Sequence, residues 1–167
     1  FARIENRNNN ECYDVTSFLI TVYNTPIANI VEDIEVCDNN IDGNDSNGQI
    51  TTNLLDIDTL VLGNQNTADY TITYHNSQSD ADNGLNNLVS SYYNLTPNQE
   101  EVYVRIENVL YTDCFDTTSF NIIVNPIPEA FDSSLFQCDE DGIPEGFTIF
   151  NLTEVNDDLT GGNTNRS

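Results

Sequence analysis

The chain repeats itself at an interval of about one hundred residues, and this repeat constrains its fold more than any other feature. The segment Arg3-Ile4-Glu5-Asn6 returns as Arg105-Ile106-Glu107-Asn108, a shift of 102 positions. The same shift relates further identities: Cys12 to Cys114, Asp14 to Asp116, Thr16-Ser17-Phe18 to Thr118-Ser119-Phe120, Ile20 to Ile122, Val22 to Val124 and Pro26 to Pro128. Later matches drift, with Cys37-Asp38 returning as Cys138-Asp139 and Asn53-Leu54 as Asn151-Leu152. A period of this length indicates one domain per repeat, because solenoid repeats span only about 20–50 residues.

The repeat divides the chain into three parts. Residues 1–25 correspond to the end of one repeat, residues 26–126 to a complete repeat, and residues 127–167 to the start of a third. Prolines at 26, 126 and 128 mark the joints, where they stop strand pairing and stiffen the connection. The chain contains no methionine and no recognisable signal peptide, so we expect a mature product or an excised piece.

Alternation of apolar and polar residues predicts β-strands throughout the complete repeat. Tyr70, Ile72 and Tyr74 share one face, for example, with polar side chains between them. We expect strands at 31–37, 48–55, 69–76, 88–93, 101–109 and 117–125, and short helical turns at Asp56–Leu62 and Asp80–Leu88. In the first copy, Phe18, Ile20 and Val22 repeat the strand pattern. The expected fold class is all-β, with tandem immunoglobulin-like β-sandwich repeats of about 100 residues.

The charge of the chain excludes several classes of function. There are 28 Asp and Glu residues against four arginines and no lysine, so the formal net charge is −24. No basic surface is available for nucleic acid or for an anionic membrane. No run of about 18 apolar residues exists for direct membrane insertion. Hydrophobic residues make up 38% of the chain and favour strands, so we expect a folded protein in which something offsets the self-repulsion.

The four cysteines indicate disulfides in an oxidising compartment. Our leading prediction joins Cys37 to Cys114 within the complete repeat. The alternative joins consecutive repeats, Cys12 to Cys37 and Cys114 to Cys138. No Cys-x-x-Cys spacing is present, which argues against zinc and redox chemistry.

An Asp- and Asn-rich loop follows Cys37 and is a candidate calcium site. Its oxygen-bearing side chains alternate and Gly43 follows them, as in the first half of an EF-hand loop; the candidate ligands are Asp38, Asn40, Asp42, Asn44 and Asp45. The twelfth position is Gln49 where an EF-hand has glutamate, so an Asx turn is the alternative interpretation. The second copy retains Asp139 and Asp141.

The remaining chemical groups do not indicate an enzyme. His75 is the only histidine and is expected on the polar face of a strand, so no catalytic triad can be built. Arg105 with Glu107, like Arg3 with Glu5, is expected on an exposed strand face, where ion pairs contribute little. The alternative for Arg105 is a contact with an acidic patch of the adjoining repeat. Tyr92, Tyr93 and Tyr111 could form a sugar-stacking surface, although strand aromatics are more often part of a core.

Several segments, taken in order, resemble the tandem repeats of giant cell-surface proteins of gliding and marine Bacteroidetes. The segments are EVCDNNIDGNDSNGQITTNLLDI, YTITYHNSQSDADNGLNNL and VYVRIENVLYTDCFDTTSFNIIVNPIP. The resemblance covers the whole chain and implies an extracellular adhesin or filament stalk without enzymatic activity, exported by type IX secretion. Thr59 in Asp58-Thr59-Leu60 and Thr117 in Asp116-Thr117-Thr118 also resemble the O-glycosylation sites of secreted Bacteroidetes proteins.

We therefore expect a structural and adhesive module of a very large cell-surface protein involved in gliding motility. Expected partners are neighbouring repeats, surface glycans or other cells, and the secretion machinery. The alternative is a carbohydrate- or ligand-binding β-sandwich that uses Tyr92, Tyr93 and the 38–45 loop.

Overall fold

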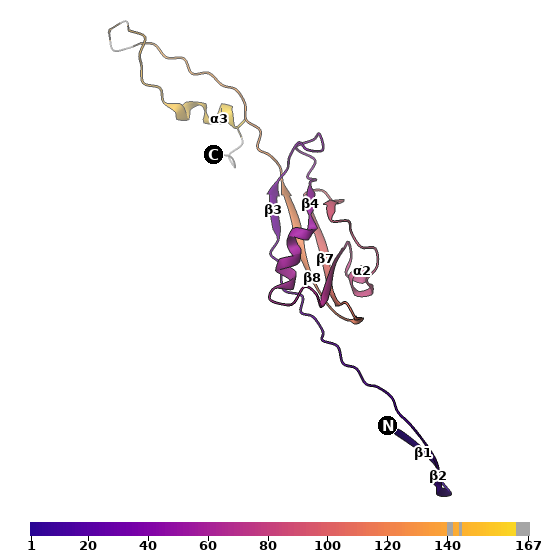
Figure 1. Cartoon of the computed structure of the whole chain (residues 1–167). Coiled ribbons are helices and arrows are strands. Elements are labelled where there is room, and N and C mark those ends of the chain that lie inside the picture. The colour runs from indigo at the N-terminus through magenta and orange to yellow at the C-terminus, as the bar shows by residue number, and fades with distance from the viewer. Residues whose placement is uncertain (140–141, 144, 163–167) are drawn as a thin grey trace.

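The computed structural model describes all residues except 140, 141, 144 and 163–167. Figure 1 shows a central unit with a separate hairpin on its N-terminal side and an extended segment on its C-terminal side. The hairpin consists of β1 (Ala2–Asn6) and β2 (Asn9–Thr16). The C-terminal segment contains η2 (Leu152–Val155) and α3 (Asn156–Leu159).

The central unit consists of two sheets. The larger sheet has the strand order β3-β8-β7-β5, and its strands are β3 (Ile34–Cys37), β5 (Tyr70–His75), β7 (Gln99–Asn108) and β8 (Tyr111–Asn125). Strand β3 runs parallel to β8, whereas β7 runs antiparallel to both of its neighbours, β8 and β5. The smaller sheet pairs β4 (Thr51–Asn53) with β6 (Ser91–Tyr93). This arrangement confirms the expected all-β, sandwich-like fold.

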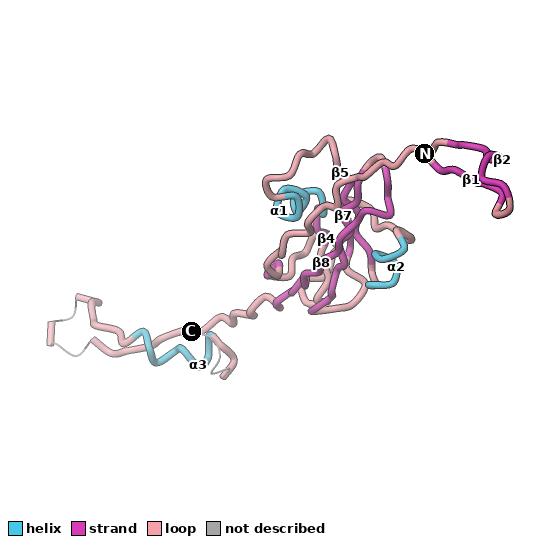
Figure 2. Tube along the Cα trace, turned by 90° about the horizontal axis from the view of Figure 1, so that it is seen from below, coloured by secondary structure: helices cyan, strands magenta, loops and turns pink. Residues whose placement is uncertain are grey.

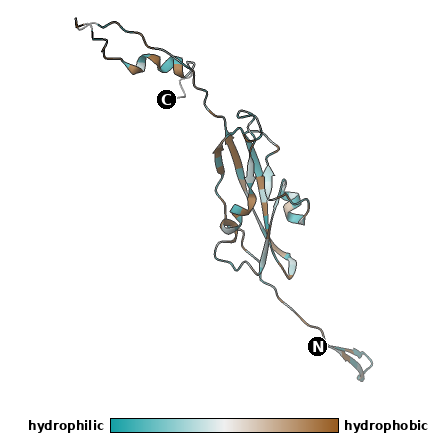
Figure 3. Ribbon diagram, turned by 45° about the horizontal axis from the view of Figure 1, so that its top comes forward, coloured by the Kyte–Doolittle hydropathy of each residue, from teal (hydrophilic) through white to brown (hydrophobic). Residues whose placement is uncertain are grey.

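The core lies on one face of the larger sheet. Alternate residues of β7 and β8 point into it and are almost fully buried; they are Val102, Val104, Ile106, Phe120, Ile122 and Val124. Leu54, Val61 and Tyr92 from the other elements pack into the same cluster. Figure 3 shows the hydrophobic colour along these strands, and loops that are mainly hydrophilic. The period-two pattern therefore positions the apolar face as the sequence predicts.

Short helices complete the central unit. The first expected helical turn is present as η1 (Leu54–Ile57) followed by α1 (Asp58–Leu62). The second lies earlier than the expected Asp80–Leu88: it is α2 (Gln78–Asn83), which begins after Ser77 and ends before Gly84. The Ser77 hydroxyl accepts a hydrogen bond from the Asp80 amide, and Gly84 takes the left-handed conformation that ends the helix. Helices α1 and α2 lie on opposite sides of the strands (Figure 2), and α2 contacts β5 and β7.

Several strand boundaries differ from the expected ones. Strand β8 begins at Tyr111, six residues before the predicted start, because it pairs with β7 along the whole hairpin. Strands β3, β4 and β6 are shorter than expected. The predicted strand through Phe18, Ile20 and Val22 is not formed, and these three side chains are exposed. Their counterparts Phe120, Ile122 and Val124 pair with β3 and β7, whereas residues 17–23 have no equivalent partner strand among the described residues.

Candidate functional site

The chain reaches the central unit at one end, which we call the N-terminal end. It is formed by Tyr23, Asn24, Asn108, Tyr111 and Cys114. The rings of Tyr23 and Tyr111 stack with their centroids 5.5 Å apart. The buried Asn108 side chain donates a hydrogen bond to the Asn24 carbonyl over 3.1 Å, and Cys114 Sγ lies 3.9 Å from the Tyr23 carbonyl oxygen. The incoming chain is thus attached to the tip of the β7–β8 hairpin.

The chain leaves at the opposite end of β8, which we call the C-terminal end. There Cys37 lies opposite Asn125 in the parallel β3–β8 register, and the Asp38 amide donates to the Asn125 carbonyl over 2.7 Å. Residues 126–129, which follow directly, border the Asp-rich loop at Asp45 and Ser46. The two ends of the unit therefore each carry one cysteine and one connection to a neighbouring repeat.

The intra-repeat disulfide expected between Cys37 and Cys114 is incompatible with this fold. Cys37 lies beside Asn125, and Cys114 is 11 residues earlier on the same strand. A strand rises about 3.3 Å per residue, so the two cysteines are roughly 35 Å apart. A disulfide requires Cα atoms about 4.4–6.8 Å apart. The structure accordingly leaves both thiols free, with Cys37 exposed and Cys114 partly exposed.

The alternative pairing of consecutive cysteines is not formed either, because Cys12 and Cys138 are also free and exposed. Cys12 is the counterpart of Cys114 and Cys138 is the counterpart of Cys37. Joining Cys12 to Cys37, or Cys114 to Cys138, would connect the N-terminal end of one repeat to the C-terminal end of the next. In units that follow one another end to end, those are the two most distant ends.

Asp38 closes the Asp-rich loop by hydrogen bonding and is almost completely buried. Its carboxylate accepts hydrogen bonds from the Asn39 amide over 2.7 Å and from the Gly48 amide over 2.7 Å. Gly48 has a φ of +71°, and a Cβ there would lie 2.6 Å from the Asn98 side chain, so only glycine fits. In the next repeat, Asp139 likewise accepts from the Gly146 amide over 2.9 Å. This aspartate–glycine contact is a structural device that our sequence analysis missed.

The other candidate calcium ligands are exposed and spread along the loop. Asp42 accepts hydrogen bonds from the Asn47 amide group, the Tyr93 hydroxyl and the Asn44 backbone amide. The bond from Asn47, followed by that from Tyr93, lowers the pKa of the Asp42 carboxyl below its usual range. Asn44 accepts from Ser46, while Asn40 and Asp45 are exposed.

Within the described residues, no three Asp, Glu, His or Cys side chains gather in a way that could hold a metal ion. Asp139 of the second copy is described, whereas Asp141 lies outside the described residues. Asp38 and Asp42 would have to exchange their present hydrogen bonds for metal coordination. Calcium binding therefore stays a prediction.

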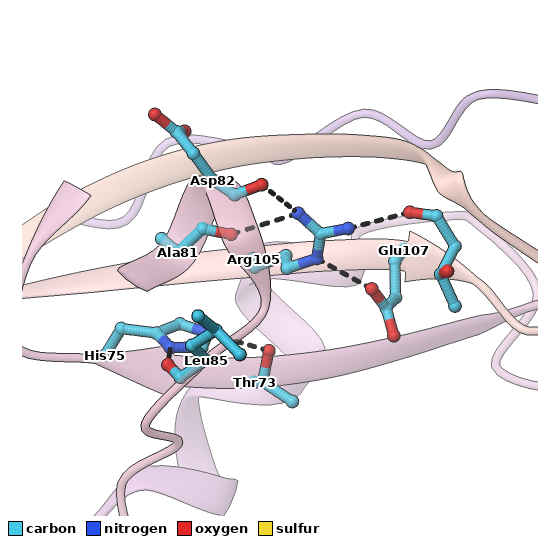
Figure 4. Close-up of polar contacts among 8 residues, drawn as sticks. Thr73, His75, Ala81, Asp82, Leu85, Arg105 and Glu107 are labelled. Carbon is cyan, nitrogen blue, oxygen red and sulfur yellow. Dashed lines mark hydrogen bonds and ion pairs between the residues drawn. The ribbon is translucent and has the colours of Figure 1, made fainter. Parts of the chain in front are cut away.

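Arg105 is buried, contrary to the expectation of an exposed ion pair. Its guanidinium donates to the carboxylate of Glu107 over 2.7 Å, to the carbonyls of Ala81 and Asp82 at the end of α2, and to the Thr112 carbonyl (Figure 4). It also lies over the Phe115 ring, 3.7 Å from the ring centroid. The polar face of the sheet is thus covered by α2, which strand alternation alone cannot reveal.

His75 is also buried on this face and has a structural role (Figure 4). Its Nδ1 is 2.6 Å from the Leu85 carbonyl oxygen, and its Nε2 is 2.9 Å from the Thr73 hydroxyl. Because a carbonyl can only accept, Nδ1 donates and Nε2 accepts from Thr73 when the ring is neutral. His75 thereby attaches the segment after α2 to the sheet.

The three tyrosines do not form one stacking surface. Tyr92 is buried in the core, and its hydroxyl donates to Asn76 and Glu100; burial is the main reason that its pKa is raised. Tyr93 is more exposed and is bonded to Asp42, whereas Tyr111 stacks on Tyr23 at the N-terminal end. The carbohydrate site expected from Tyr92 and Tyr93 together is therefore not assembled.

The two candidate glycosylation threonines differ in exposure. Thr59 is exposed on α1, and the neighbouring Asp58 accepts a hydrogen bond from Tyr74. Thr117 is only partly exposed, and its hydroxyl accepts a hydrogen bond from Gln78 over 3.1 Å. Thr59 is the more accessible of the two.

Comparison with known families gives a match over most of the central unit. Residues 33–128 match the model of a family described as the Flavobacterium inter-domain disulphide bond domain. Searches of curated proteins and of solved structures returned no match for the chain. In the described part of the chain, no helix has both the length and the apolar character needed to cross a membrane.

Proposed function

Because the chain belongs to the Flavobacterium inter-domain disulphide bond domain family, we propose that it is a structural, non-enzymatic part of an extracellular array of repeats. Disulfides between domains persist in oxidising surroundings, which supports a location outside the cytosol. The array would give a very large secreted cell-surface protein its length and stiffness.

The observation that carries this proposal is the recurrence of the same local structure in successive copies. Arg3 donates to the Asn10 carbonyl, pairs with Glu5 and lies over the Tyr13 ring. These contacts reproduce those of Arg105 with Thr112, Glu107 and Phe115 at a shift of 102 positions.

The third copy repeats other contacts of the central unit. The Asn29 amide donates to the Val61 carbonyl, and the Phe131 amide donates to the Leu159 carbonyl in the same way. Helices η2 and α3 of the third copy repeat η1 and α1. Equivalent residues therefore make the same local contacts in successive copies, as expected of tandem domains.

The exposed apolar residues outside the central unit support the same interpretation. Phe18, Ile20 and Val22 are largely exposed, but their counterparts in β8 are core residues. Burying one large apolar side chain stabilises a soluble protein by about 1.5–3 kcal/mol. In a continuous array they would be buried by the other strands of their own repeat.

The finer role that we propose is that of an adhesin or filament stalk of the gliding-motility type, exported by type IX secretion. The acidic surface supports this role, since a net charge of −24 keeps long arrays soluble and prevents their collapse onto one another. Surface glycans or other cells would be contacted elsewhere in the array, because the tyrosines of this repeat do not form a shared stacking surface.

Small-angle scattering tests the structural role. The experiment compares the chain with a lengthened version in which a second copy of residues 26–127 is inserted after Ile127. Strand β8 has 15 residues and spans the unit, so each added repeat should increase the maximum dimension by about 50 Å. A lengthened protein whose maximum dimension stays the same, or grows only as an unfolded chain would, contradicts the proposal.

A further inference from the structure

The Asp-rich loop ends in an Asn-Gly sequence, Asn47-Gly48. Asparagine loses its side-chain amide most readily before glycine, because glycine has no side chain to hinder attack on the preceding residue. In this reaction the glycine nitrogen bonds to Cγ of the asparagine and expels ammonia. Water then opens the resulting succinimide to aspartate or isoaspartate, so the net change is amide plus water to carboxylic acid plus ammonia.

The side chain of Asn47 is prepared for this attack. Its Oδ1 atom accepts a hydrogen bond from the Gln49 amide over 2.9 Å. A donor at that position stabilises the negative charge that develops on the oxygen during attack. The Asn47 amide group also donates to the exposed Asp42 over 2.7 Å, but Asn47 itself is only partly buried. The carbonyl carbon therefore does not account for a lack of reaction.

The attacking nitrogen, by contrast, is firmly held. Gly48 is buried, and its N–H donates over 2.7 Å to the almost completely buried carboxylate of Asp38. Its carbonyl accepts from the Asn98 amide over 2.9 Å and from the Asn94 side chain over 3.0 Å. To react, the nitrogen must lose its proton and turn toward Asn47. The negative charge of Asp38 beside it disfavours the amide anion that this requires.

We propose that Asn47 is a latent deamidation site, and that Asp38 keeps it unreactive by binding the Gly48 nitrogen. Asp38 is a positioning residue in this role. The inference goes beyond the proposed array, because it would hold for a single repeat. In the third copy the contact between Asp139 and the Gly146 amide is retained, but Glu145 precedes the glycine. The aspartate–glycine contact is thus structural in both copies and protects an asparagine in the central unit.

Deamidation would disrupt the loop that contains it. Where the Asn47 amide now donates to Asp42, a carboxylate would face a carboxylate, and like charges at that distance repel. Isoaspartate would also add a methylene group to the backbone before Gly48, which fits closely against Asn98. The loop borders residues 126–129, so its opening would reach the connection to the following repeat.

A second Asn-Gly sequence in the same unit provides an internal control. Asn83-Gly84 lies at the end of α2, where the Asn83 side chain donates to the Ser79 carbonyl over 2.6 Å. The Gly84 amide donates to the Ala81 carbonyl over 3.3 Å. These contacts belong to α2 and do not include Asp38. Deamidation at Asn83 therefore reports unfolding of the unit, whereas deamidation at Asn47 alone reports release of the loop.

The test compares the 167-residue chain with the variants Asp38→Ala and Asp45→Ala during incubation in a mildly alkaline buffer with reductant. Peptide mapping by mass spectrometry gives the rate of deamidation at each Asn-Gly sequence, and the parent chain in urea gives the unrestrained rates. Losing a hydrogen bond to a charged group should accelerate the reaction at Asn47 roughly 10- to 150-fold in Asp38→Ala. Asp45→Ala, whose exposed side chain lies in the same loop, should react like the parent. Asn83 should react equally slowly in all three folded proteins.

A second variant, Asp38→Asn, keeps the size of the side chain but offers one acceptor oxygen and no charge. Its rate at Asn47 should lie between those of the parent and Asp38→Ala. If Asp38→Ala also accelerates the reaction at Asn83, it is unfolded, and an unchanged Asn47 rate in folded Asp38→Asn then overturns the inference. A parent chain that reacts at Asn47 as fast as in urea contradicts it. Slower reaction in the Asp38 variants than in the parent would make Asp38 a base that promotes the attack, which is the opposite role.

Discussion

Replacing Arg105 by alanine should destabilise the central unit strongly. The side chain is buried, with 5% of its surface exposed, and it donates to one carboxylate and three carbonyl oxygens. Alanine would remove this donor from Glu107, itself largely buried, and from the three carbonyls, of which that of Ala81 would keep the Gly84 amide. Removing one partner of a buried ion pair costs about 3–5 kcal/mol.

Urea denaturation followed by far-UV circular dichroism measures this effect, and the absence of tryptophan makes fluorescence less suitable. With a urea dependence of about 1–3 kcal/mol per molar, the midpoint should fall by at least about 1 M, and by about 2 M for middle values of both quantities. Arg105→Lys keeps the charge but not the planar set of donors, so it should lose a large part of the same stability.

The repeat provides a matched control in Arg3. This residue makes the same type of contacts with Glu5, Asn10 and Tyr13, but half of its side-chain surface is exposed and none of the described helices covers it. Exposed ion pairs contribute about 0–1 kcal/mol, so Arg3→Ala should hardly change the midpoint. Equal midpoints for Arg105→Ala and the parent chain, or equal losses for the two alanine variants, would refute the argument from burial.

Four further predictions concern the Asp-rich loop and the surface. Asp38→Ala should cost about 1–3 kcal/mol in urea unfolding because it leaves the buried Gly48 amide and the partly buried Asn39 amide without an acceptor, whereas the exposed Asp45→Ala should change stability by less than about 0.5 kcal/mol. If calcium binds, EDTA should lower the melting temperature and excess Ca²⁺ should restore it, and an unchanged melting curve would refute the site. The pKa of Asp42 is lowered in the folded state, so its contribution is present above the usual aspartate pKa and is lost as the pH falls through the folded value. Asp42→Asn should therefore show a shallower loss of melting temperature below about pH 4 than the parent chain. Intact-mass analysis of native material should show added glycan that Thr59→Ala removes, and a mass equal to the bare polypeptide would contradict the glycosylation.

Much of the fold could be predicted from the sequence because its strands have one buried face. The alternation in β5 and β7 gave the correct inward residues, such as Val104 and Ile106. The prediction was wrong where partners decide the outcome. Phe18, Ile20 and Val22 have the same pattern as β8, but a strand forms only where a neighbour supplies its hydrogen bonds.

The site was less predictable, since polar residues can be buried by elements that lie far away in the sequence. Alternation placed Arg105 and His75 on the polar face, and only the packing of α2 and the Leu85 segment shows that this face is covered. Asp38 was expected to be a metal ligand, but the fold brings Gly48 to its carboxylate. The spacing of Asp38 and Gly48 in the loop carried no pattern that we recognised.

The sequence by itself determined the period of the repeat, the β-rich character of each copy and the presence of two cysteines per repeat. These features follow from local periodicity and from identities at a constant shift, and both can be recognised without knowing where the residues lie in space. Only the tertiary structure decided which cysteines can meet. The 15-residue strand β8 carries Cys114 at one end of the unit, and its pairing with β3 holds Cys37 at the other. Cys37 and Cys114 belong to the same repeat but lie far apart in space, because an extended strand such as β8 keeps its two ends about 50 Å apart.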